Sequence, residues 1–121
     1  MEFEVTVKNI SETPIKGVVL IECESKDGRF SISFEYPRHV LGKYVDFSVG
    51  DELLLALHKE KTSELDKWDV YMHGMVYHVR DIGEGRKVFY ISIWGYQVRL
   101  CAPEQLLNLY DKVYIGIKKL K

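Results

Sequence analysis

The amino-acid sequence predicts an all-β domain, either a barrel or a sandwich. Three observations support this class: alternating apolar and polar residues at the N-terminus, a hairpin signature around Asp27-Gly28, and turn residues roughly every dozen positions between short apolar runs. These turns divide the chain into about eight strands. A chain of 121 residues suits one domain, and we expect a single domain over residues 1–121.

The first strands are the clearest. Residues 2–8 read "EFEVTVK", in which apolar and polar side chains alternate with the period of a half-buried strand, and a turn through "SETP" follows. Residues 17–25 are rich in β-branched side chains, and residues 30–36 again alternate. Asp27 and Gly28 lie between these two runs and can supply the positive φ of a hairpin turn, so the runs are predicted to pair.

The middle of the chain is less regular. "YPRHVLGKYVDF" is predicted to form a loop with a short helical turn, because Pro37 and Gly42 interrupt any regular pattern. The leucines and alanine of "VGDELLLALHKE" are compatible with a helix, but the length of this stretch and the Gly50-Asp51 turn favour a strand. "KTSELDK" is predicted to be a polar connector.

The second half is predicted to add four more strands. Three of them cover residues 68–80, 87–94 and 95–101, with a turn through "DIGEGR" between the first two. "APEQLLNLY" follows them and carries a short helical pattern, and "DKVYIGIKKL" is predicted to be the final strand, with Gly116 inside it.

A faint internal repeat relates the two halves. Gly17 is followed by Gly28-Arg29, and Gly74 by Gly85-Arg86 at the same spacing, while "VGDELLLALHK" parallels "LYDKVYIGIKK". Two pseudo-symmetric halves, about 1–60 and 68–121, are one interpretation of this pattern, and a coincidence of turn glycines is the other.

Composition and charge argue against several classes of protein. The chain is 46% hydrophobic, and its 17 basic residues balance 18 acidic ones, so neither disorder nor a general attraction to polyanions is expected. There is no signal-peptide pattern and no apolar run of about 18 residues, and we expect a soluble cytoplasmic protein. Cys23 and Cys101 lack the paired spacing of zinc sites and are predicted to be buried thiols.

Potential metal ligands concentrate in "YMHGMVYHV", residues 71–79. His73 and His78 lie five residues apart, so a strand would send them to opposite faces, and a helix would separate them by roughly 140°. The stretch is therefore predicted to be a strand, with Gly74 allowing a bulge or close backbone packing. A metalloenzyme built around these histidines is kept only as a minor alternative.

Other catalytic patterns are weak. The serines and cysteines lack the local elbow of a nucleophile, and "IGEGRK" lacks the Gly-Lys-Ser/Thr pattern of a phosphate loop. The acidic pair Asp51-Glu52 fits a solvated turn better than general acid-base catalysis. We expect no catalytic residue, no cofactor and no metal site.

Aromatic residues gather in the second half and either pack the core or stack on bases across an exposed face. "SIWGYQVRL" is distinctive, because Gly95 between Trp94 and Tyr96 indicates a sharp bend or a close backbone approach beside amphipathic rings. Exposed rings at a bend are typical of a protein-binding anchor, whereas a barrel corner packed on itself is the alternative.

Five blocks in order carry a resemblance to a known family: "CESKDGRFSISFEYP", "FSVGDELLLAL", "YMHGMVYHV", "ISIWGYQVRL" and "DKVYIGIKKLK". With them the chain resembles a small subunit of multisubunit RNA polymerases, the eukaryotic eighth-subunit and archaeal G-subunit family. The resemblance implies an eight-stranded antiparallel Greek-key barrel related to the OB fold, with two pseudo-symmetric halves. Eukaryotic members have a long acidic loop where this chain has only "KEKTSELDK", which favours an archaeal-type minimal subunit. They usually have two glycines where this chain has only Gly95, so Trp94 and Tyr96 are expected to alter the contact that the family makes at this bend.

The resemblance implies a non-catalytic subunit of DNA-dependent RNA polymerase that docks on the largest subunit and supports assembly or stability. Its partners would be the largest and other core subunits, with DNA or RNA contacted only indirectly or weakly, and no membrane. Trp94, Gly95, Tyr96 and Arg99 are the predicted partner-binding residues. The alternative is a stand-alone OB-type module that binds single-stranded nucleic acid, with a groove lined by basic residues: Arg86, Lys87, Arg99, Lys118 and Lys119.

Overall fold

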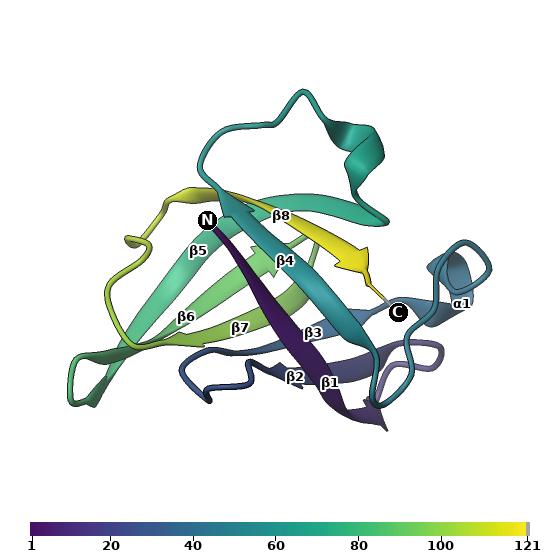
Figure 1. The fold of residues 1–121 in the computed structure, drawn as a ribbon, viewed down its shortest axis with the longest axis horizontal. Helices are drawn as coiled ribbons and strands as arrows, with labels where there is room; N and C mark the ends of the chain where they lie inside the picture. The colour runs from purple at the N-terminus through teal and green to yellow at the C-terminus, as the bar shows by residue number, and fades with distance from the viewer. Residues whose placement is uncertain (121) are drawn as a thin grey trace.

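Eight antiparallel strands pair around a closed barrel in the computed structural model, which describes residues 1–120 (Figure 1). The strands are β1 (Glu2–Glu12), β2 (Val19–Glu24), β3 (Ser31–Tyr36), β4 (Glu52–His58), β5 (Val70–Gly83), β6 (Arg86–Ile93), β7 (Tyr96–Ala102) and β8 (Lys112–Lys119). Two short helices, α1 (Arg38–Leu41) and the 3₁₀ turn η1 (Leu65–Lys67), lie in the connections on either side of β4. None of the helices in the described part of the chain is long and apolar enough to cross a membrane.

The strand order around the barrel is β1-β2-β3-β7-β6-β5-β8-β4. In each half the fourth strand pairs with the first, which gives the order of a Greek key in both β1 to β4 and β5 to β8. Antiparallel pairing of β3 with β7 and of β4 with β8 joins the halves and closes the sheet. The expected all-β antiparallel barrel is confirmed, and the equal strand order is what a repeat over 1–60 and 68–121 would give, although that repeat stays a prediction.

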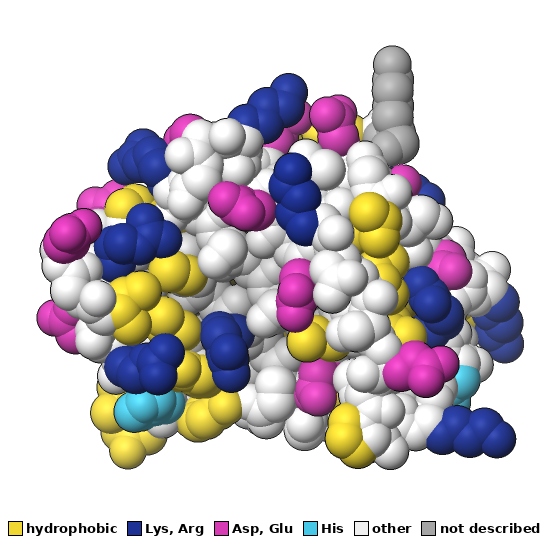
Figure 2. All heavy atoms as spheres, turned by 90° about the horizontal axis from the view of Figure 1, so that it is seen from below, with side chains coloured by type: hydrophobic (Ala, Val, Ile, Leu, Met, Phe, Trp, Pro, Cys, Tyr) yellow, Lys and Arg dark blue, Asp and Glu magenta, His cyan; other side chains and the backbone are white. Residues whose placement is uncertain are grey.

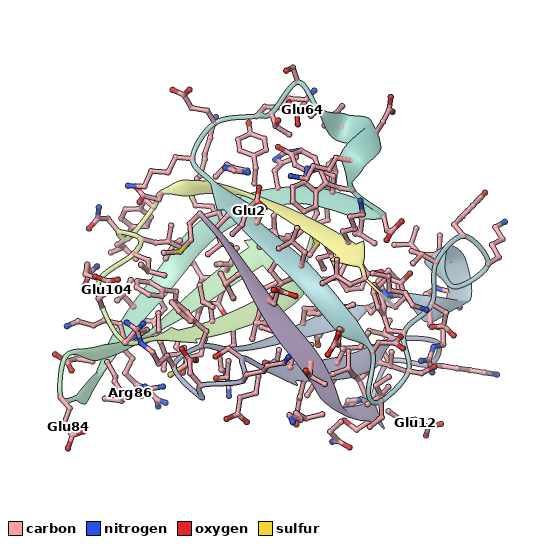
Figure 3. The ribbon with its side chains drawn as sticks, viewed as in Figure 1. Glu2, Glu12, Glu64, Glu84, Arg86 and Glu104 are labelled. Carbon is pink, nitrogen blue, oxygen red and sulfur yellow. The ribbon has the colours of Figure 1, made fainter. Side chains whose placement is uncertain are left out.

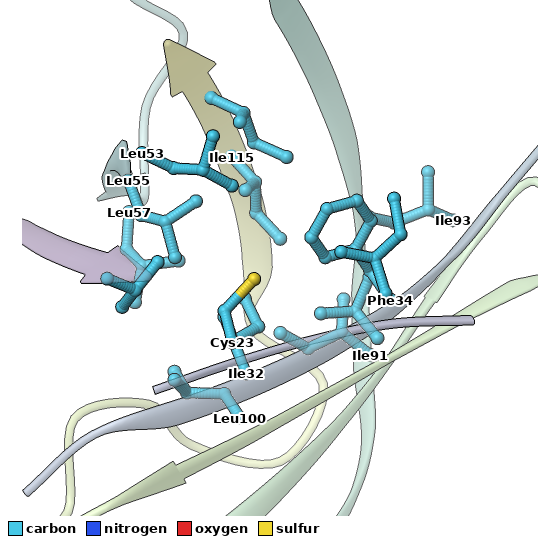
Figure 4. Packing of buried hydrophobic residues seen from close by; sticks show 14 of the residues in the cluster. Cys23, Ile32, Phe34, Leu53, Leu55, Leu57, Ile91, Ile93, Leu100 and Ile115 are labelled. Atoms are coloured by element: carbon cyan, nitrogen blue, oxygen red, sulfur yellow. The ribbon is translucent and has the colours of Figure 1, made fainter. Parts of the chain in front are cut away.

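The interior is filled by alternate side chains of every strand. Leu53 and Leu55 of β4, Ile91 of β6 and Ile115 of β8 are fully buried, and Figure 4 shows them directed into one shared core. The stretch "VGDELLLALHKE" therefore forms a strand, as predicted, because three leucines at alternate positions face this core.

Outside the barrel, the connection between β4 and β5 lays Trp68 across β8. A Cβ atom added at Gly116 would lie 2.5 Å from Trp68 Cδ2, so the indole covers the strand at the position that lacks a side chain. Trp68 is only 9% exposed as a result. The glycine predicted inside the last strand thus makes room for an aromatic side chain from a different connection.

Residues 102–110 ("APEQLLNLY") are the clearest error of the sequence prediction, because they form no helix. Their main chain instead pairs with β5: the Tyr110 amide donates to the Val76 carbonyl at 2.8 Å, and the Val76 amide donates to the Asp111 carbonyl at 3.0 Å. The Asn108 amide donates to Asp111 Oδ2 at 2.8 Å, a local bond that competes with helical hydrogen bonding. β1 also runs on to Glu12, past the predicted end at residue 8.

Candidate interface at the mouth of the barrel

The bend between β6 and β7 is a two-residue hairpin turn. Ile93 pairs with Tyr96, and the two residues between them both have positive φ, 53° at Trp94 and 86° at Gly95. This is the pattern of a type I′ turn, which suits the twist of a hairpin. The predicted sharp bend is present, but a bulky residue at positive φ is unusual, so the turn holds Trp94 in a strained backbone conformation.

The strained turn presents the Trp94 side chain to solvent, where it is 83% exposed. Its ring meets His73 edge to face at 6.2 Å, and His73 lies 5.5 Å from Tyr114. Tyr114 in turn stacks on Tyr71 at 6.1 Å. These four side chains form an aromatic row along the outer face of β8 and β5 that ends at the bend.

Tyr96, on the other side of the turn, lines an apolar recess at this end of the barrel. The recess has a volume of about 280 Å³. Its walls come from several elements and include Tyr36 of β3, Leu41 of α1, and Val70 and Met72 of β5. We call this space the mouth recess, because it lies where the strands end and the core side chains become accessible.

Tyr36 anchors one wall of the mouth recess. Its hydroxyl donates a hydrogen bond to the carbonyl of Val45, and its ring packs edge to face on Phe47 at 5.1 Å. Burial, with a smaller contribution from Asp46, raises the pKa of the Tyr36 phenol to about 12. The phenol therefore stays neutral at physiological pH, and the wall keeps its apolar character.

The structure separates Arg99 from the other predicted interface residues. Its guanidinium lies over the Tyr90 ring, 5.1 Å from the centroid, and Arg80 lies over the same ring at 6.0 Å. Tyr77 and His78 are also in contact with Tyr90, at centroid distances of 6.2 Å and 5.2 Å. Trp94, Gly95 and Tyr96 thus belong to the mouth, and Arg99 belongs to a second group around Tyr90, which we call the Tyr90 cluster.

The prediction that His73 and His78 lie on opposite faces is wrong. A β-bulge between Val76 and His78 inserts Tyr77 as an extra residue against β6, which reverses the alternation of β5. Both histidines are consequently exposed on the outer face, but His73 contacts Trp94 and Tyr114 while His78 contacts Tyr90. Among residues 1–120, no group of three or more His, Cys, Asp or Glu side chains could hold a metal ion.

Gly74 provides close packing rather than the bulge. A Cβ atom at this position would lie 2.1 Å from the carbonyl oxygen of Ser92, so only glycine lets β5 approach β6 here. Of the two predicted buried thiols, Cys23 is buried, whereas Cys101 is half-buried and accepts a 3.1 Å hydrogen bond from Arg86. Burial, and secondarily the charge of Glu22, raises the pKa of Cys23 to about 12.

The basic groove of the nucleic-acid alternative is not assembled. Lys87 pairs with Asp81 at 2.8 Å, and Lys119 pairs with Asp51 at 3.4 Å at the far end of β8. Arg86 lies near the β5–β6 hairpin, whose tip carries the outward-pointing Glu84 (Figure 3). Figure 2 shows the face seen from below, where hydrophobic side chains gather at the lower left and basic side chains are spread over the face with acidic ones between them.

The sequence prediction included the bend and missed the walls of the mouth recess. Tyr36, Leu41, Val70 and Met72 are distant from Trp94 along the chain and become neighbours only through strand order. One usable signal was present, since the alternation in residues 30–36 places an inward tyrosine immediately before Pro37, where a strand has to end.

The fold and this region define a class: a small closed β barrel that displays a strained aromatic bend beside an open, apolar mouth. A family model that describes the G subunit of DNA-directed RNA polymerase matches residues 1–120. The chain therefore belongs to the G-subunit family of DNA-directed RNA polymerase.

No curated protein sequence matches the chain significantly. Among solved structures, a crystal structure of the cytoplasmic molybdate-binding protein ModG with molybdate bound is similar over 98% of this chain and 89% of that chain, with 12% sequence identity and a TM-score of 0.41.

Proposed function

We propose that this chain is a non-catalytic, cytoplasmic subunit of RNA polymerase that docks on the largest subunit through the β6–β7 bend and supports assembly or stability of the enzyme. Membership of the G-subunit family makes other polymerase subunits its partners. The observation that carries the docking surface is Trp94, held 83% exposed at a positive φ.

Two physical arguments favour the bend as the contact. The Trp94 side chain loses little conformational entropy on docking, because its position is already set by the turn and by the edge-to-face contact with His73. Tryptophan is also the residue type most enriched at energetic hot spots of protein interfaces, where truncation costs about 2 kcal/mol or more. The strained backbone at Trp94 does not contribute to packing of the core. A role in holding the ring in solvent for a partner would explain why the strain is tolerated.

The alternative, a single-stranded nucleic-acid module, is favoured by one observation. The Tyr90 cluster brings two arginines over one half-buried aromatic ring on the outer face, a combination that can stack bases and contact phosphates. Acidic residues weaken this interpretation, because Glu22 and Glu35 line the groove that adjoins Tyr90 and Arg99. Repulsion of phosphates by these carboxylates would offset the attraction of the arginines.

The test is reconstitution of the polymerase with Trp94→Asn. Asparagine is preferred at the first position of a type I′ turn followed by glycine, so this change removes the ring while keeping or improving the fold. We expect affinity for the remaining subunits to fall about thirtyfold, as loss of roughly 2 kcal/mol implies. Loss of the second ring with Tyr96→Ala should weaken incorporation further.

Tyr110→Asn is the matched control. Tyr110 is also an exposed aromatic residue at positive φ, 69% exposed with φ of 70°, but it precedes β8, whereas the mouth lies near the other end of that strand. Incorporation of the Tyr110 variant at wild-type occupancy is expected. Wild-type incorporation of the Trp94→Asn, Tyr96→Ala protein would refute the assignment, and steeply salt-dependent oligonucleotide binding by the isolated chain would favour the alternative.

A further inference from the structure

We infer that the mouth recess receives one large apolar side chain from an extended segment of the docking partner, and that Glu35 pairs with a basic residue beside that side chain. This inference rests on the proposed docking function and specifies the chemistry of the segment that is bound. Contact with the bend would then orient the partner, and the recess would determine which segment of the partner binds.

The recess has the lining and size for an apolar anchor. Leu41, Val70 and Met72 contribute aliphatic walls, and Tyr36 of β3 and Tyr96 of β7 contribute aromatic ones. At about 280 Å³ it accommodates one large side chain and not a folded element. Burial of this apolar surface contributes most to the binding free energy when one side chain fills the recess completely.

The main chain around the mouth is arranged to hold an extended segment. Pairing of β3 with β7 stops at Phe34 and Val98, so the end of β3 continues without a neighbouring strand on that side. Pairing of β5 with β6 starts only at Met75 and Ser92, and Gly74 packs against the Ser92 carbonyl, which leaves Val70–His73 paired with β8 alone. Strand ends with one open side are the places where a partner segment can add main-chain hydrogen bonds.

The recess carries one acidic side chain, Glu35. It is the single Asp, Glu, Lys or Arg side chain among the described residues that line the recess. One carboxylate oxygen, Oε1, accepts a 2.7 Å hydrogen bond from the main-chain amide of Gln97, and this bond ties the carboxylate to β7. Arg38, the nearest basic residue along the chain, is engaged by Asp46 at 2.8 Å. Arg99, which lines the adjoining groove with Glu35, lies over the Tyr90 ring. A basic residue in the partner would complement this carboxylate.

The experiment uses overlapping short peptides that cover the largest polymerase subunit, with the full chain as the probe. Binding of each retained peptide is then measured by titration against the chain. Retained peptides are expected to contain a Phe, Leu, Ile or Met next to Lys or Arg, and replacement of that apolar residue by Ala should abolish retention. Retention of peptides without this pattern would overturn the inference.

Two variants of this chain test the recess itself. Val70→Phe fills it from one wall and should raise the Kd of the best peptide at least about tenfold, whereas Met75→Phe enlarges an exposed side chain of the same strand and should leave Kd unchanged. Glu35→Gln keeps an acceptor for the Gln97 amide but removes the charge. It should raise Kd about threefold at low salt and have no effect near 1 M salt.

The outcomes separate this inference from the proposed function. If the wild-type chain does not enter reconstituted polymerase, the docking function itself fails. If it enters, and folded Val70→Phe and Glu35→Gln variants enter with wild-type affinity, docking stands and the recess has no part in it. Thermal unfolding of each variant establishes that it is folded under the conditions of the titration.

Discussion

The contact between Trp68 and Gly116 gives the sharpest prediction about stability. Gly116 has no positive φ, so alanine can adopt its backbone conformation, and the only obstacle to a methyl group is the indole above it. The added Cβ would lie 2.5 Å from Cδ2 and 2.8 Å from both Cε2 and Cε3 of Trp68. Gly116→Ala is therefore expected to push the indole away from the barrel by about 1 Å to restore van der Waals distances.

The size of the effect follows from these distances. Overpacking of this kind costs about 1–3 kcal/mol, while the gain from replacing glycine by alanine inside a strand is only about 0.5–1 kcal/mol. With Trp68 in place, the methyl group should thus destabilise the protein. Once Trp68 has been truncated to Ala, the same methyl group meets open space and should stabilise the protein. Because the gain from alanine is present in both backgrounds, the two changes are coupled by the overpacking cost alone, roughly 1–3 kcal/mol.

A double-mutant cycle measures this coupling. Free energies of unfolding come from urea titrations of the wild type, Gly116→Ala, Trp68→Ala and the double variant, followed by circular dichroism, which does not depend on tryptophan emission. Trp68→Ala alone should cost about 3–5 kcal/mol, as expected for a large buried ring. An equal cost for Gly116→Ala in both backgrounds would show that the indole does not occupy this site, and the reasoning would fail.

Three further predictions concern the core and the mouth. Gly74→Ala should destabilise the protein by roughly 3 kcal/mol in the same urea assay, because the obstacle is the Ser92 main chain, which cannot turn aside; a loss below about 0.5 kcal/mol would contradict the close approach of β5 to β6. A thiol reagent at pH 8 should modify the half-buried Cys101 first, and Cys23, with its pKa of about 12, should react only as the protein unfolds; equal rates for the two thiols by peptide mapping would refute this. The raised pKa of Tyr36 contributes stability that is complete below pH 10 and is lost as pH rises from 10 towards 12, so a Tyr36→Phe variant should lose less stability than the wild type over that interval, and parallel losses would contradict the shift.

Much of the fold was predictable because it depends on local alternation. The turn at Asp27-Gly28 and the strand through "VGDELLLALHKE" follow from rules that operate within a few residues, and the structure has both. The same local rules gave the wrong structure for residues 102–110, since the Tyr110 amide bonds to Val76 of β5, and no local pattern reveals a partner so distant along the chain. Propensity for a helix was overridden by tertiary hydrogen bonding.

Part of the candidate site was likewise predictable from the sequence, and part was not. Gly95 made the bend visible in the sequence, because a glycine between two large aromatic residues has few structural uses other than a turn. The bulge at Tyr77 left no such mark, and it places His78 on the same outer face as His73 instead of the opposite one. The mouth recess depends on which strands are neighbours, which is a property of the closed order of the barrel and not of any one segment.

The position of β8 in that order also has a consequence for synthesis of the protein. β8 pairs with both β4 and β5, so it joins the first half of the barrel to the second, yet it is the last of the eight strands along the chain. On the ribosome, β4 and β5 emerge with one edge each unpaired and must wait until Lys112–Lys119 have left the exit tunnel. We expect the nascent chain to depend on chaperones during this interval, and ring closure, rather than the formation of any hairpin, to set the time at which a docking-competent molecule first exists.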